Sequence, residues 1–161
     1  MKNKQASDYF HGEDGYNCAQ AVLKAFQPES GMPELVIRSA TVAGGGRAKG
    51  GTCGALYAAQ IVLGEGQHSA QVANEFLTAF GSTLCSDIKQ SEGGCRHFVG
   101  KTAEFTERHL DNINTQNDDY VKAREIREID MLSQEKNNLF PLYLAIKKVT
   151  SKVTFCYLKL K

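Results

Sequence analysis

The chain has 161 residues, of which 42% are hydrophobic and 23% are charged, and its formal net charge is +1. This length fits one domain better than two, and the composition is that of an ordinary globular protein with a core of its own. The near-zero net charge gives no basis for a nucleic-acid-binding surface, and no apolar run approaches the roughly 20 residues that a membrane span requires.

The first 18 residues contain no apolar segment of the kind found in signal peptides, so we expect a cytoplasmic protein. Its five cysteines are Cys18, Cys53, Cys85, Cys95 and Cys156. In a reducing compartment, cysteines in this number are more typical of metal binding, catalysis or burial than of a disulfide framework.

The first half of the chain has the spacing of short helices. Asn17 is a good N-cap, and Gln20 at the third helical position completes a capping box. Pro28 ends this helix, and Pro33 fits the first turn of the next, over residues 33–43. Thr52 is then the expected N-cap of a helix over residues 53–63.

A longer helix is expected from Ser69, with Cys85 close to its end, because apolar residues recur every three to four positions. Another helix begins near Cys95, and residues 118–132 form an amphipathic segment with Asn117 as its cap. No convincing strand pattern occurs before residue 140.

The sequence therefore predicts an all-α fold with a single compact domain of about five to seven helices over residues 1–135. Residues 136–161 form an extension. Its last nine residues, VTFCYLKLK, are compatible with a strand or with a basic tail.

The glycine-rich segment 44–51, GGGRAKGG, has the composition of a phosphate-binding loop. A P-loop has its lysine after the second glycine, whereas Lys49 precedes Gly50. The dinucleotide pattern G-x-G-x-x-G also fails, because Lys49 stands at its last position and a helix precedes it. What remains is a generic anion site with Arg47 and Lys49 nearby.

Four of the cysteines lie at expected helix ends. Cys18 follows the capping Asn17, Cys53 follows Thr52, Cys95 follows two glycines, and Cys85 falls at the end of a helix. Peptide N–H groups and the helix dipole favour a thiolate at an N-terminal end, which suits sulfur bound to a metal or cluster. No C-x-x-C pair occurs, which argues against zinc ribbons and thioredoxin-like chemistry.

The order GYNCAQAVL, then TCGA after the glycine-rich loop, then FGSTLC and GGCRHFVG resembles a family of redox-active proteins named for the pattern C, CGAxxG, C, C. A related region forms part of the split-Soret cytochromes c. The resemblance covers about residues 5–112, and it implies a helical fold with four functional cysteines. The chain departs from the pattern at Ala58, where the motif has glycine.

Three interpretations of these cysteines stay open. In the first, Cys18, Cys53, Cys85 and Cys95 bind an iron–sulfur cluster for electron transfer. In the second, the protein is a thiol–disulfide oxidoreductase in which Cys53 or Cys95 attacks first, and in the third the four thiolates hold a structural zinc ion. An electron-transfer or thiol partner protein is implied by the first two, and a homodimer is compatible with helices rich in small residues.

Other side chains near these positions are weaker candidates. His11 is a possible spare ligand or base, whereas His97 and His109 are better explained as surface or core residues. Arg47 and Lys49 are candidates for tuning the thiolates, and Tyr16 and Tyr57 for covering the site.

Overall fold

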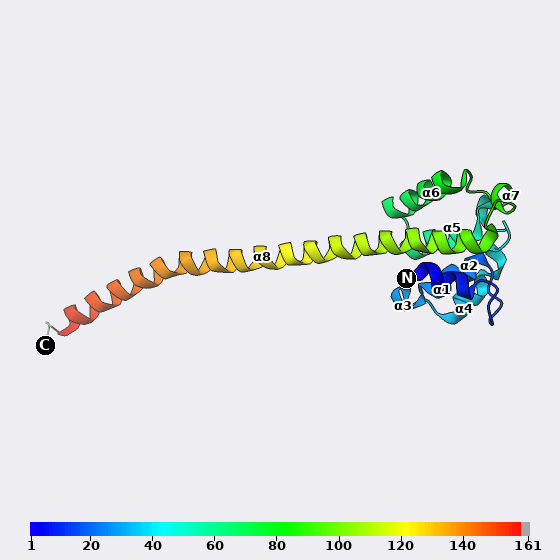
Figure 1. The fold of residues 1–161 in the computed structure, drawn as a ribbon. Coiled ribbons are helices and arrows are strands. Elements are labelled where there is room, and N and C mark those ends of the chain that lie inside the picture. The colour runs from blue at the N-terminus through cyan, green and yellow to red at the C-terminus, as the bar shows by residue number, and fades with distance from the viewer. Residues whose placement is uncertain (159–161) are drawn as a thin grey trace. The chain divides into compact units, whose positions relative to one another are not determined.

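The computed structural model describes the backbone of residues 1–158 and the side chains of residues 1–127. The chain divides into two units, Met1–Ile113 (unit 1) and Asn114–Lys161 (unit 2). The elements in chain order are α1 (Lys2–Tyr9), α2 (Cys18–Ala25), α3 (Gln27–Ser30), α4 (Glu34–Ser39), the 3-10 helices η1 (Ala40–Ala43) and η2 (Lys49–Gly51), α5 (Gly54–Leu63), α6 (Gln67–Phe80), α7 (Cys85–Ile88) and α8 (Gly94–Leu158) (Figure 1).

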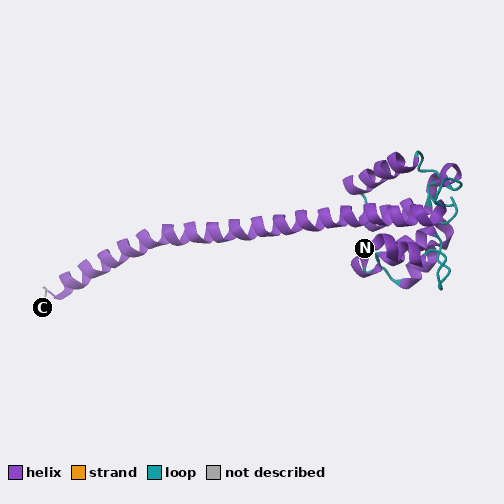
Figure 2. Cartoon of the chain, viewed as in Figure 1, coloured by secondary structure: helices purple, strands orange, loops and turns teal. Residues whose placement is uncertain are grey.

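The described residues form helices and connecting loops, with no β-strand beyond two isolated bridges (Figure 2). This confirms the all-α fold class. Two of the eight α-helices, α3 and α7, are single turns of four residues. The remaining six lie within the expected five to seven.

The start of α2 follows the predicted capping box. The Asn17 side-chain oxygen accepts hydrogen bonds from the backbone N–H groups of Ala19 and Gln20, at 3.0 and 3.1 Å. The Gln20 side chain in turn accepts from the Asn17 N–H at 3.1 Å. These bonds satisfy N–H groups that a helix start leaves without partners, which is why α2 begins at Cys18.

The core of unit 1 is built around α2, which packs against α1 and α5, while α5 packs against α6. Seven of the eight residues of α2 are buried. The largest fully buried side chains of the unit include Tyr16, Phe26, Phe76 and Phe98, from the segment before α2, its C-cap, α6 and α8. Burial of these aromatic rings provides much of the apolar area that stabilises the unit.

The glycine-rich segment connects η1 to α5. Within it Gly45, Gly46, Gly50 and Gly51 all have positive φ angles, between 63° and 80°. Glycine adopts this left-handed conformation at little cost, so the segment can fold back tightly before α5. The N-cap of α5 is Cys53, one residue later than the expected Thr52.

Two predicted helix boundaries are wrong. The long helix predicted to end near Cys85 is α6, which closes at Gly81 in a left-handed conformation with φ of 78°. The predicted break before Asn117 is absent, because α8 continues through it. Residues 101–117 contain neither glycine nor proline, so nothing in the local sequence stops the helix.

Residues 114–158 of unit 2 are helical throughout. The strand considered for residues 153–161 is therefore not formed over 153–158, and 159–161 lie outside the described residues. A strand needs a partner to satisfy its peptide groups, whereas a helix bonds internally. Tyr120, Val121 and Ile126 are 67%, 51% and 64% exposed. Among the described helices, none has an apolar stretch long enough to cross a membrane.

Candidate functional site

The four cysteines of the motif all lie where a helix of the chain begins. Cys18 is the first residue of α2, Cys53 is the N-cap of α5, Cys85 is the first residue of α7 and Cys95 is the second residue of α8. The prediction that Cys85 lies at a helix end is wrong, because α6 stops short of it. At a helix start, peptide N–H groups without intrahelical partners are available to a sulfur atom.

Gly54, the residue after Cys53, is the point at which Cys18 approaches α5. A Cβ atom on Gly54 would lie 2.6 Å from Cys18 Sγ and 2.7 Å from the carbonyl oxygen of Ala43. Real Cβ atoms essentially never come this close to other heavy atoms. The missing side chain therefore gives the Cys18 sulfur its place beside the start of α5.

A second close approach brings Cys85 against the glycine-rich loop. A Cβ on Gly46 would lie 3.0 Å from Cys85 Cβ and 3.5 Å from its Sγ. An isolated antiparallel bridge pairs Thr52 with Leu84, and the Cys53 N–H donates to the carbonyl oxygen of Thr83 at 2.8 Å. These backbone contacts hold the segment of Cys53 beside that of Cys85.

The four thiols are close enough for their charges to act on one another. Cys18 acts on Cys53, Cys85 and Cys95, and Cys85 acts on both Cys53 and Cys95. Cys18, Cys53 and Cys85 are only 4–6% exposed, whereas Cys95 is half-buried. All four are free thiols. The structure thus collects four sulfur atoms, three of them buried.

Three of the thiols, those of Cys53, Cys85 and Cys95, have raised pKa values and are therefore not activated nucleophiles. Burial raises the pKa of the Cys53 thiol to about 12, and the neighbouring Cys18 adds to this. The backbone N–H groups of Ala55 and Leu56 lower the pKa, as expected of a helix start, but by less. Burial, followed by the charge of Cys18, also raises the pKa of Cys85 and Cys95. At Cys53 burial therefore outweighs the expected preference of a helix start for thiolate.

The distances among the cysteine sulfur atoms limit which metal group they could bind. Within the residues whose side chains are described, no three His, Cys, Asp or Glu side chains are grouped closely enough for one metal ion. A zinc ion holds its ligand atoms at about 2.0–2.3 Å. In a four-iron cluster each cysteine binds a different iron, so the sulfurs stand further apart. The described side chains of these cysteines therefore do not form a site for a single metal ion.

The two tyrosines considered as covers of the site have structural roles. Tyr16 is buried, and its hydroxyl donates a hydrogen bond to the carboxylate of Glu34. Tyr57 is half-buried and packs against the core.

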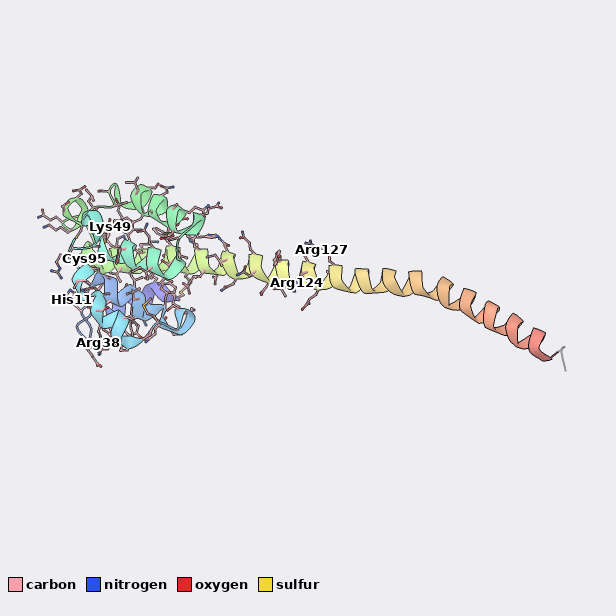
Figure 3. All side chains as sticks on the ribbon, turned by 180° about the vertical axis from the view of Figure 1, so that it is seen from behind. His11, Arg38, Lys49, Cys95, Arg124 and Arg127 are labelled. Carbon is pink, nitrogen blue, oxygen red and sulfur yellow. The ribbon has the colours of Figure 1, made fainter. Side chains whose placement is uncertain are left out.

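The charged candidates lie at the surface. Arg47 donates to the carbonyl oxygen of Thr41 at 3.1 Å, and Lys49 is exposed. His11 is also exposed, and its ring lies 4.3 Å from that of Phe10. Figure 3 places Lys49, Cys95 and His11 at the same end of unit 1, the end at which the loops gather in Figure 2.

The two remaining histidines behave differently from each other. His97 is exposed beside Phe80, and with Arg96 and Lys101 it lines an open cavity of about 290 Å³. His109 is buried and contacts His68 and Glu75, neither of which the sequence pointed to. His68 and Glu75 are seven residues apart, which puts them on one helix face, but the helix they meet is set by the tertiary fold.

Residues 16–109 match the family described as "Putative redox-active protein (C_GCAxxG_C_C)". Since the match covers more than half of the 161 residues, the chain belongs to this redox-active, cysteine-containing family. No curated protein and no solved structure matches the chain. Cys18, Cys53, Cys85 and Cys95 all lie within the matched region, and Cys156 lies outside it.

The family's central motif is written G-C-A-x-x-G, not C-G-A-x-x-G as in the resemblance described from the sequence. Aligned on Cys53, this order has alanine where the chain has Gly54, and glycine where it has Thr52 and Tyr57. The departure predicted at Ala58 is therefore wrong, because Ala58 lies beyond the last position of the motif. In this chain Cys18 Sγ and the Ala43 carbonyl oxygen occupy the space that a side chain at Gly54 would need.

Proposed function

We propose that this protein is an electron carrier whose Cys18, Cys53, Cys85 and Cys95 bind one iron–sulfur cluster. The observation that carries the proposal is the gathering of these four free thiols, each at the start of a helix and each within electrostatic reach of Cys18. Membership of a redox-active family also supports a redox function.

Electrostatics favour a polycationic group at this position. Four thiolates in a buried space repel one another, and this repulsion adds to the desolvation that keeps the thiols neutral. Bound metal ions supply positive charge and displace the thiol protons. When bound, the cluster would accept and release single electrons at a potential set by its surroundings.

The chain's own groups would tune that potential. The backbone N–H groups of Ala55 and Leu56 favour negative charge on the Cys53 sulfur, and such groups near cluster sulfurs shift the reduction potential. Cys95 is the most exposed of the four thiols, so a partner protein that exchanges electrons with the cluster would approach most closely there.

The two alternatives receive less support. A thiol–disulfide oxidoreductase needs an accessible, low-pKa cysteine. Cys53 is buried and its pKa is raised, and Cys95 is half-buried with a raised pKa as well. A structural zinc ion needs thiolates grouped more tightly than these side chains are. A partner protein and a homodimer stay predictions.

Anaerobic purification followed by iron and acid-labile sulfide analysis tests the cluster. We expect about four iron and four sulfide per chain after reconstitution, as for a four-thiolate [4Fe–4S] cluster, with an electron paramagnetic resonance signal on reduction. Replacing any one of Cys18, Cys53, Cys85 or Cys95 by serine should strongly reduce bound iron. Cys156→Ser is the matched control, because Cys156 lies outside the family match and should not affect iron content.

Other outcomes would contradict the proposal. Stoichiometric zinc without sulfide, lost together with thermal stability on chelation, would identify a structural metal site. A reversible disulfide between two of the four cysteines, with reduction of a test disulfide that Cys53→Ser abolishes, would identify a thiol oxidoreductase. Iron-free protein after reconstitution would exclude a cluster.

A further inference from the structure

A second group of titratable side chains, separate from the cysteines, joins α6 to α8 within unit 1. The Nδ1 atoms of His68 and His109 are 3.1 Å apart. The other ring nitrogen of His109, Nε2, is 3.2 Å from Glu75 Oε1, and the second carboxylate oxygen of Glu75 accepts from Arg108 at 2.7 Å. The His109 side chain is only 8% exposed, whereas His68 is half-buried.

The partners of His109 determine where the protons sit. A carboxylate ion-paired to Arg108 is an acceptor, so Nε2 of His109 carries the hydrogen that faces Glu75. Its Nδ1 then presents a lone pair, and Nδ1 of His68 must carry the hydrogen between the two rings. A single chain of hydrogen bonds therefore runs from His68 through His109 to Glu75.

We propose that the His68–His109 pair is a pH-dependent contact, called here the clasp, that holds the start of α6 on α8. The contact is kept while both rings are neutral or only one of them is protonated. It opens when both rings are protonated. The first proton binds Nε2 of His68 and leaves the hydrogen-bond chain intact. The second can bind only at Nδ1 of His109. Two N–H groups and two positive charges then face each other across the contact.

The carboxylate that contacts His109 is already paired with another cation. Glu75 of α6 faces Nε2 of His109, and Arg108 of α8 donates to the other oxygen of Glu75, so two protonated rings would stand beside a carboxylate that is already ion-paired. Helix α5, which packs against α6, contains no Asp, Glu, Lys, Arg or His, and its one titratable side chain is Tyr57.

Opening would be confined to the start of α6. At its other end Phe80 packs edge-on against Phe76 and Phe98, with ring centroids 4.7 and 4.8 Å apart. Val72 and Phe76 are fully buried. These apolar contacts are insensitive to pH, so only the first turn of α6, which contains His68, would separate while the rest of the helix stays in place.

The proton positions are tested first, by nitrogen-15 NMR of the histidine rings of the full chain at pH 7.5 in the presence of a chelator. The chain has only four histidines, so each can be assigned. We expect a hydrogen on Nδ1 of His68 and on Nε2 of His109. A hydrogen on Nε2 of His68 with none on its Nδ1 would overturn the proposal.

Opening is tested by amide hydrogen exchange from pH 7.5 to pH 5, corrected for the intrinsic pH dependence of exchange. Imidazole titrates in this range. We expect the opening equilibrium at the start of α6 to rise by up to about tenfold per pH unit for each proton taken up on opening, while α5 changes little. Equal pH responses of α5 and α6 would overturn the clasp.

His109→Gln and His68→Gln should each weaken protection of α6 at pH 7.5 and reduce its pH dependence. The matched control is His11→Asn, since His11 is exposed and asparagine tolerates its φ of 53°. An unchanged pH dependence in His68→Gln would contradict the proposal. If His109→Gln fails to fold, His68→Gln at its half-buried position and the ring spectra of the unaltered chain still decide the question.

Discussion

Gly54 has no side chain at the point where two cysteine-bearing segments meet. Cys18 Sγ and the Ala43 carbonyl oxygen occupy the space that a Cβ atom would need. Within the glycine-rich segment 44–51 that leads to Cys53, Gly46 likewise lies against Cys85. Close approach of a cysteine to the backbone therefore explains these glycines better than phosphate binding does. At the residue scale, the absence of a methyl group at Gly54 leaves room in this chain for Cys18 beside the start of α5.

We expect Gly54→Ala to destabilise the protein by about 1–3 kcal/mol, the usual cost of forcing an extra methyl group into a packed site. Iron content after reconstitution should fall as well, because Cys18 must move away from Cys53. Urea unfolding and iron analysis measure the two effects. The control is Ala58→Gly, which should cost about 1 kcal/mol in helix propensity without affecting iron. Unchanged iron content in Gly54→Ala would contradict the prediction.

Glu34 is a second residue whose environment has a measurable consequence. Its carboxylate accepts hydrogen bonds from Lys24 at 2.7 Å and from the Tyr16 hydroxyl, and it pairs with Arg38 at 3.2 Å. These partners, Lys24 first and then Tyr16, lower the Glu34 pKa from 4.5 to about 2. The folded chain therefore favours the ionised form of Glu34 more than the unfolded chain does.

The corresponding contribution to stability is complete above pH 4.5 and is lost as the pH falls towards 2. We expect Glu34→Gln to be less stable than the parent chain at pH 6, with the difference shrinking between pH 4.5 and pH 2. Urea unfolding midpoints across this range give the comparison. Because other carboxylates titrate in both proteins, the difference between the two curves is the relevant quantity. A difference that stays constant with pH would exclude the proposed role of Glu34.

At the scale of the element, the start of α2 depends on one side chain. Asn17 caps the helix through its oxygen, and its Nδ2 donates to the carbonyl oxygen of Thr41 at 3.0 Å, which ties the helix start to η1. A Cβ on Gly44 would lie 2.5 Å from the same Nδ2 atom, so the glycine leaves room for the amide. The cap therefore organises both α2 and the start of the loop.

We expect Asn17→Ala to lower the free energy of unfolding by about 1 kcal/mol, the usual value of an N-cap. Asn17→Asp keeps the accepting oxygen but loses the donor to Thr41, so it should lie between the parent chain and Asn17→Ala. Thermal unfolding of the three proteins measures the order. If Asn17→Asp were as unstable as Asn17→Ala, the contact to Thr41 would outweigh the cap.

At the scale of the whole molecule, the four motif cysteines and the family match all fall within unit 1, Met1–Ile113. We expect a chain of residues 1–113 to fold and to bind as much iron as the full chain. Circular dichroism and iron analysis provide the measurement. A chain of residues 1–135, which ends at the boundary expected from the sequence, is the matched comparison. Failure of 1–113 alone would favour that longer boundary.

Several features could be predicted from the sequence because their causes are local. Helical periodicity gave the all-α class, the Asn17–Gln20 pair gave the start of α2, and the order of the cysteines gave the family. Local signals were insufficient at Cys85, where the turn after Gly81 separates α6 from α7, and at Asn117, where a good capping residue lies inside α8.

Only the tertiary structure decided which side chains meet. The contact of Cys18 with Gly54, the bridge from Thr52 to Leu84 and the pairing of His68 with His109 all join segments distant in the sequence. Burial likewise outweighed the helix-start effect on the pKa of Cys53, and burial depends on the packing of several helices at once. Periodicity and capping follow from neighbours along the chain, whereas desolvation and close approach follow from neighbours in space.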